Sequence, residues 1–278
     1  DSAALLDLLQ VVQPEAAFQT PLFEKGYLNV LNEPLTKPLR IAFSTKSPVL
    51  TPVSEEAIKA VQKVVRWLER EGHVVEEKEP PIDGVQLMKA YYLMNSGEMN
   101  ATILELEAML GRRLTADDME IESWVLHVAG QKVTAAEYTQ SLAYWDQAAE
   151  RMAYFHREYD FYITPATAHP APKVGELTHA REKQMQLREA IAFADKEEQQ
   201  QIIYDMFLPS LTYTPFTQLA NLTGQPGISV PVHVTADRLP LGVQIMTQKG
   251  AEHRLLQLAA QLEQTDLWVG MKGNPYFK

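Results

Sequence analysis

The side chains best suited to chemistry gather in one run of the sequence, residues 211–227, which reads LTYTPFTQLANLTGQPG. Hydroxyl and carboxamide groups are interspersed there with apolar side chains. Two segments with the pattern of short strands follow the run. Polar groups near strand ends can line a ligand site. The polar candidates in this run are Tyr213, Thr214, Thr217, Gln218, Asn221 and Gln225.

A purely structural explanation exists for the same residues. We predict the stretch 221–227 to be a loop. The side chains of Asn221 and Thr223 would then form hydrogen bonds to the backbone of its turn. Tyr213 and Phe216 would belong to the core. Ser229 lies inside an apolar segment, and we expect it to be a buried, hydrogen-bonded hydroxyl. The sequence alone leaves both explanations open.

The local signatures of catalysis and metal binding are missing from this sequence. It has no Gly-x-Gly-x-x-Gly run and no P-loop lysine, so no nucleotide phosphate site is expected. The chain has no Cys, and its histidines show no zinc-ligand spacing. No Ser stands in Gly-x-Ser-x-Gly, and no two glycines are adjacent. We therefore predict no catalytic residue, no metal and no cofactor.

The candidate residues must be positioned by strands and helices. The first of these that the sequence predicts clearly form a strand–helix–strand unit over residues 39–77. Residues 39–43 form an apolar strand, Ser54 can cap a following helix, and Gly72 can end it. Residues 73–77 form the next strand. A strand, a helix and a strand of these lengths predict a βαβ crossover with parallel strands.

Strands and helices alternate along the rest of the chain. An opening helix over 1–12 should place Ala4, Leu5, Leu8 and Leu9 on its apolar face, and Thr115 with Asp117 and Asp118 suits a helix start. This alternation predicts an α/β fold with a mixed central sheet flanked by helices. The other predicted helices are 84–110, 134–159, 178–207 and 251–264, and the other strands are 161–164, 228–234 and 241–246.

Composition narrows the classes of partner. The 278 residues are 46% hydrophobic and 22% charged, as in ordinary globular proteins. A net charge of -11 argues against nucleic acids and anionic membranes as partners. No apolar run approaches the length of a membrane-spanning helix, and the lack of Cys is consistent with a cytoplasmic location.

Three segments together resemble one known family. They are 160-DFYITPATAHPAP-172, the run 214–248 with ANLTGQPGISVPV and LPLGVQ, and the helix at 255–268. The chain resembles the C-terminal half of an amidase-signature hydrolase, among the bacterial amidases of the 6-aminohexanoate-cyclic-dimer hydrolase type. The resemblance covers essentially all of 1–278, which would be the C-terminal part of one amidase-signature domain.

The resemblance implies a Ser nucleophile, a bridging Ser in a cis peptide and a Lys, all located before the region seen here. It also implies that two segments, 212–218 and 164–170, border the substrate. We therefore predict a pocket wall without its nucleophile. The predicted substrate-binding residues are Thr164, Tyr213, Thr214, Phe216, Thr217 and Asn221.

Three hypotheses follow for the chain as a whole. It is an inactive amidase fragment that hydrolyses a small-molecule amide only when complemented by the N-terminal half. Alternatively, it is a non-catalytic truncated module that self-associates as a homo-oligomer. A third candidate is a protein similar to the glutamine-hydrolysing component of the tRNA-dependent amidotransferases. That branch of the family has an acidic residue near the position of Thr214, so the neutral Thr disfavours it.

Overall fold

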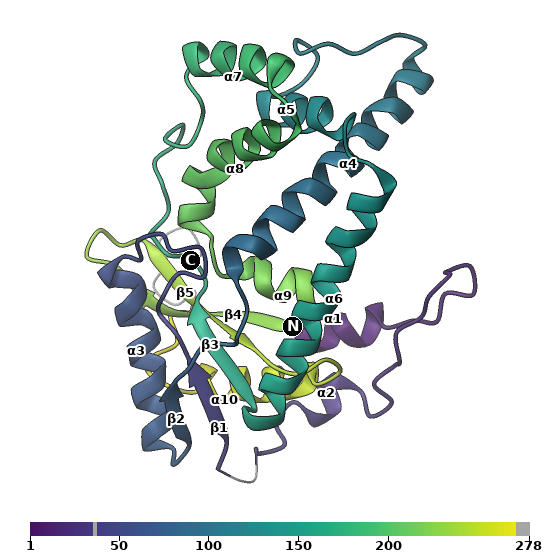
Figure 1. Cartoon of the computed structure of the whole chain (residues 1–278). Helices are drawn as coiled ribbons and strands as arrows, with labels where there is room; N and C mark the ends of the chain where they lie inside the picture. Colours follow the sequence, from purple (N-terminus) through teal and green to yellow (C-terminus); the bar gives the residue numbers. More distant parts are fainter. Residues whose placement is uncertain (36–37, 271–278) are drawn as a thin grey trace, which may run out of the picture.

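The computed structural model describes residues 1–35 and 38–270, and a mixed sheet with helices on both faces forms its base (Figure 1). The strands run in the order β2-β1-β3-β5-β4. β1 is parallel to β2 and β3, whereas β5 is antiparallel to both of its neighbours. The α/β prediction is confirmed. The strands are β1 (Arg40–Phe43), β2 (Val74–Glu77), β3 (Phe161–Pro165), β4 (Gly227–Val234) and β5 (Pro240–Met246).

The predicted βαβ unit is present as β1, α3 (Glu55–Arg70) and β2. The Ser54 hydroxyl accepts a hydrogen bond from the Ala57 N–H at 3.3 Å, which caps the helix. Gly72 follows the helix with φ +86°, a conformation that side-chain-bearing residues rarely adopt. Arg40 pairs with Val74 in parallel register, as expected.

Each face of the sheet has its own layer of helices. On one face, α3 and α10 (Glu252–Glu263) cover a core that includes Ile41, Phe161 and Ile245. On the other, Tyr162 and Met246 pack among residues of α6 (Ala135–Glu158) and α9 (Thr217–Thr223). Because side chains alternate along a strand, consecutive residues of β3 serve the two layers in turn.

A second core lies beyond the sheet, where α4 (Gly84–Leu110), α5 (Ile121–Gly130), α7 (Arg181–Phe193) and α8 (Lys196–Tyr213) pack together with α6 (Figure 1). A Cβ on Gly130 would lie 2.0 Å from the Ser96 carbonyl oxygen, so the glycine allows α5 to approach α4 closely. The predicted helix 178–207 is in fact two helices. Asp195 ends the break between them and caps α8 with a capping box.

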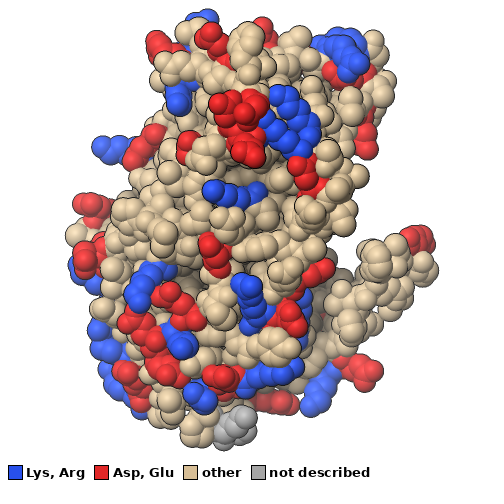
Figure 2. All heavy atoms as spheres, in the orientation of Figure 1, with Lys and Arg blue, Asp and Glu red and all other residues tan. Residues whose placement is uncertain are grey.

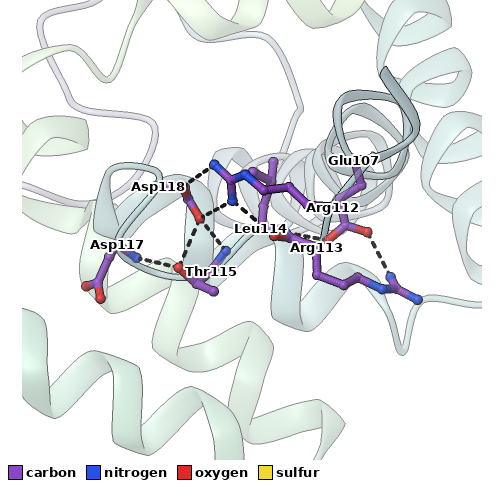
Figure 3. Close-up of polar contacts among 7 residues, drawn as sticks. All are labelled: Glu107, Arg112, Arg113, Leu114, Thr115, Asp117 and Asp118. Atoms are coloured by element: carbon purple, nitrogen blue, oxygen red, sulfur yellow. Dashed lines mark hydrogen bonds and ion pairs between the residues drawn. The ribbon is translucent and has the colours of Figure 1, made fainter. Parts of the chain in front are cut away.

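The connection from α4 to α5 corrects one prediction, because no helix begins at residues 115–118 (Figure 3). The Asp118 carboxylate accepts a hydrogen bond from the Thr115 N–H at 2.8 Å and binds the Arg112 guanidinium through both oxygens. The guanidinium holds the pKa of Asp118 well below its usual range. These contacts close a turn, and α5 starts only at Ile121.

The N-terminal segment corrects a second prediction. In α1 (Ser2–Leu9) the buried residue is Ala3, which packs in a small cluster with α2 (Tyr27–Val30) and α10. Leu5, Leu8 and Leu9 are 57%, 75% and 72% exposed. The spacing identified a helix correctly, but the face that packs is the one that carries Ala3 and Leu6.

Charges of both signs are interspersed over the face of the molecule drawn in Figure 2. One ion pair joins two helices of the second core: Glu137, in the first turn of α6, binds Lys196, the first residue of α8. Glu137 also accepts a hydrogen bond from the Thr134 N–H at 2.9 Å. The Lys196 contact, aided by Thr134, lowers the pKa of Glu137 to about 2.

Replacing this carboxylate should therefore have a pH-dependent effect on stability. Because the folded-state pKa lies below the unfolded value, the Glu137 contribution is present above about pH 4.5 and is lost as the pH falls toward 2. We expect Glu137→Gln to lower the urea midpoint at pH 7 and to approach the wild type near pH 2. The control is Asp146→Asn, an exposed site on the same helix. If the urea midpoint of Glu137→Gln differs from that of the wild type by the same amount at pH 7 and pH 2, the pH-dependent contribution of Glu137 is contradicted.

Candidate substrate-binding site

A hollow of about 320 Å³ lies at the carboxyl ends of the parallel strands. Its walls come from the segment after β1, the segment between β2 and α4, the end of β3, and the junction of α8 with α9. The carboxyl ends of parallel strands are where open α/β sheets place ligands. The volume falls at the small end of the usual range for ligand pockets, roughly 300–1,000 Å³.

A second hollow of about 270 Å³ adjoins the first, between α4 and the α8–α9 region. Aromatic rings line it, with Tyr92 stacked on Phe207 at a centroid distance of 5.1 Å. The carboxamides of Asn95 and Asn221 add polar groups. Two side chains, Met88 and Gln218, line both hollows.

An ionic cluster borders the first hollow. The fully buried Ser44 hydroxyl donates to the Glu79 carboxylate at 3.0 Å, and the Lys46 ammonium lies 3.4 Å from the same oxygen. Lys46 also pairs with Glu77 at 3.2 Å. The hydrogen bond to Glu77, followed by that to Glu79, raises the pKa of Lys46. This lysine is therefore a charged group at the site and is unsuited to act as a neutral base.

Two of the predicted residues, Thr164 and Phe216, line the first hollow. Both are buried. The Thr164 hydroxyl donates to the Pro165 carbonyl at 3.1 Å and accepts from the Gln244 carboxamide at 3.4 Å. Gln244 also donates to the Phe216 carbonyl at 3.4 Å. A buried amide on β5 thus ties together two parts of the wall that are distant in sequence.

Two other predicted residues, Thr214 and Asn221, line the second hollow. The Thr214 hydroxyl donates to the Ser210 carbonyl at 3.2 Å, one helical turn earlier. Asn221 is exposed and belongs to α9, so the loop prediction is wrong for residues 221–223. A helix forms there because Leu222 and Ala220 are buried. It ends at Gly224, which has φ +73°.

The remaining predicted residues, Tyr213 and Thr217, line neither hollow. The Tyr213 hydroxyl donates to Glu176 at 2.8 Å, and this hydrogen bond raises the pKa of Tyr213. Its ring lies 5.1 Å from the His169 ring. Thr217 makes one long contact, 3.4 Å, to the Gln218 carboxamide oxygen. A role in substrate binding stays a prediction for all six residues.

Ser229 is exposed, so its expected burial is wrong. It lies on β4, an edge strand of the sheet, where one neighbour is absent. Sequence reasoning also missed Lys46, Glu79 and Gln244. Only Gln244 carried a local signal, as the one polar residue in the apolar run LGVQIM. The Lys46–Glu79 contact joins loops after different strands, which no spacing along the chain reveals.

Within the residues that the structure describes, no group of three or more His, Cys, Asp or Glu side chains could hold a metal ion. Over the same residues, no Ser hydroxyl is hydrogen-bonded to a Lys ammonium. A search of the described helices found none with the length and apolar character needed to cross a membrane.

Comparison with known proteins shows the family to which this chain belongs. The family model described as Amidase matches residues 1–256. The chain belongs to the amidase family. It is 36% identical over 253 residues to a lipoamidase of Enterococcus faecalis, a match that covers 91% of this chain and 34% of that protein. It is 29% identical over 277 residues to a 6-aminohexanoate-cyclic-dimer hydrolase of Paenarthrobacter ureafaciens, covering 98% and 53%.

Solved amidase structures agree with the fold. A 6-aminohexanoate cyclic dimer hydrolase, determined with its substrate, superposes with a TM-score of 0.79 at 28% identity. That match covers 94% of this chain and 52% of the solved one. A bacterial aryl acylamidase of the amidase signature family superposes with a TM-score of 0.65 at 17% identity, which supports the fold alone. This amidase-family chain therefore spans about a third to a half of the relatives it matches.

Gly84 offers a test of how the wall of the first hollow is built. A Cβ there would lie 2.3 Å from the carbonyl oxygen of Pro48, a residue of the segment after β1 that also lines the hollow. We expect Gly84→Ala to lower the free energy of unfolding by about 1–3 kcal/mol, because the clash outweighs the better helix propensity of Ala. The control is Gly227→Ala, whose Cβ would meet its nearest atom at 3.7 Å. Urea unfolding measures both variants. Equal losses of unfolding free energy in Gly84→Ala and Gly227→Ala would contradict the close contact between Gly84 and Pro48.

Proposed function

We propose that this chain supplies the substrate-binding part of an enzyme that hydrolyses a carbon–nitrogen amide bond. The observation that carries the proposal is the amidase family match over residues 1–256. The two hollows give it a physical basis, since apolar walls with a few polar groups are typical of small-molecule sites.

We infer that the residues that perform the chemistry come from polypeptide outside these 278 residues. In this family a Ser hydroxyl attacks the amide carbon, and a bridging Ser with a neutral Lys takes up its proton. The same groups return that proton to the nitrogen, the C–N bond breaks to release an amine or ammonia, and water then hydrolyses the acyl-enzyme. The ion-paired Lys46 does not suit that role, and the Gly-Ser-Ser-Gly signature is absent from the sequence. The partial coverage of the relatives is consistent with this division.

The partner that we propose is a polypeptide carrying the nucleophile, bound along an uncovered side of this chain. β4 is an edge strand of eight residues on which Ser229 is exposed, and the C-terminal segment reaches it at Pro231, whose carbonyl accepts a hydrogen bond from the Val269 N–H. Unpaired strand edges and exposed apolar side chains favour pairing with another chain. Leu8 and Leu9 of α1 add apolar surface. Self-association of two copies would use the same surfaces, and it is the alternative that this feature favours.

The substrate we propose is a small, uncharged amide with an aliphatic group. Val49, Leu87 and Phe216 line the first hollow and offer such a group an apolar surface. Thr214 has no carboxylate and its hydroxyl is engaged by the Ser210 carbonyl, so a glutamine-binding amidotransferase role has little support.

The chain should be inactive by itself. We expect no ammonia release from hexanamide above the buffer rate, because the nucleophile and its base are both missing. Hydrolysis should appear when the chain is combined with a polypeptide carrying the Gly-Ser-Ser-Gly signature and the family's Lys.

Two controls make this experiment decisive. Replacing the signature Ser of the added polypeptide by Ala should abolish the activity, and native mass spectrometry should show a one-to-one complex. Robust turnover by this chain alone would refute the proposed division of residues. A homodimer that does not bind the added polypeptide would favour the self-associating module.

A further inference from the structure

The two hollows share only a few lining residues. Of the residues lining either hollow, only Met88 and Gln218 line both. They approach from opposite elements, Met88 from α4 and Gln218 from α9. The side chains common to both hollows are therefore two, and both are unbranched.

Neither side chain is fixed by a short hydrogen bond within the described residues. Among the described residues, the only hydrogen bond to the Gln218 carboxamide is the 3.4 Å contact from the Thr217 hydroxyl, near the outer limit for such bonds. Its nitrogen has no partner there. Met88 is buried, and methionine is flexible enough to adapt to neighbouring groups. The Gln244 carboxamide behind Phe216 differs in being buried and in having two acceptors, the Phe216 carbonyl and the Thr164 hydroxyl, each at 3.4 Å.

The two hollows differ in the groups they offer. The first is lined by the charged side chains of Lys46, Glu79 and Asp83 together with apolar ones such as Val49, Leu87 and Phe216. The second is lined by the rings of Tyr91, Tyr92 and Phe207. A ligand that extends from one into the other would leave its polar end among the charged groups and bury more of its chain against the rings.

The geometry points to Gln218 and Met88 as a partition that limits the length of the aliphatic chain that this site accepts. Short straight-chain amides fit in the first hollow alone. Longer ones must displace the Gln218 side chain before they reach the second hollow. This inference rests on the proposed function for the amide group, but the length limit itself depends only on the two hollows.

Binding by the chain as it stands tests the partition. The probes are hexanamide and decanamide, with hexanol and decanol as matched compounds without the amide, and the readout is Kd by titration calorimetry. In Gln218→Ala we expect decanamide and decanol to bind about tenfold more tightly than in the wild type, because each added buried methylene group favours binding. Binding of the six-carbon probes should stay within about twofold.

Three further variants separate size from other effects. Gln218→Leu keeps the bulk of the side chain and should leave the length limit unchanged. Met88→Val shortens the other half of the partition and should reproduce the gain for decanol, which covers the case in which Gln218→Ala is poorly folded. Gln86→Ala is an exposed Gln to Ala change on α4 outside both hollows and should behave as the wild type.

The outcomes distinguish the partition from the proposed function. If decanol gains affinity but the amides bind no better than the alcohols, the partition stands and the proposed amide site fails. If neither ten-carbon probe gains affinity in Gln218→Ala or Met88→Val, the partition is refuted. An equal gain in affinity for the ten-carbon probes in Gln218→Leu would also refute the partition, because the size of the side chain at residue 218 would then have no effect.

Discussion

The burial of β3 on both faces is the constraint from which the rest of the molecule is arranged. All five of its residues are buried, and it pairs with β1 on one side and β5 on the other. Phe161 and Ile163 face the core under α3 and α10, whereas Tyr162 packs on the side of α6 and α9. Thr164 continues that second side and lines the first hollow. Because the period of a strand is two residues, the pairing that builds the core also decides which side chains reach the site.

The walls of the site depend on helices that are held by polar contacts far from it. Lys196 and Glu137 join the starts of α8 and α6. At the far end of α4, Arg188 of α7 pairs with Asp117 at 2.7 Å. Exposed ion pairs of this kind contribute little individually. They act here together with the apolar core that α4, α5 and α8 share, to which α9 contributes Leu222. This core gives defined positions to α4, which carries Met88, and to α9, which carries Gln218.

The chain has apolar surface on its outside as well as in its two hollows. We interpret the hollows as a place for substrate and the outer surface as a place for a second polypeptide. The described residues that line the hollows come from helices, strands and the segments that connect them. The leucines of α1 are exposed, and β4 is an edge strand whose Pro231 carbonyl accepts a hydrogen bond from the Val269 N–H at 2.7 Å. A chain that binds a substrate on one side and a second polypeptide on another is consistent with its amidase family membership and its partial coverage of relatives.

The sequence by itself determined the elements whose signals are local. The βαβ unit follows from apolar runs, the Ser54 cap and Gly72, and these act within a few residues of where they stand. The family resemblance was also readable, because its segments are contiguous. Only the tertiary structure decided which face of α1 packs, that Asn221 lies on a helix, and that Ser229 is exposed. The contacts of Lys46 with Glu79 and of Gln244 with Thr164 also required the fold. Each of these depends on which strands and helices become neighbours, and long-range packing sets that arrangement independently of spacing along the chain.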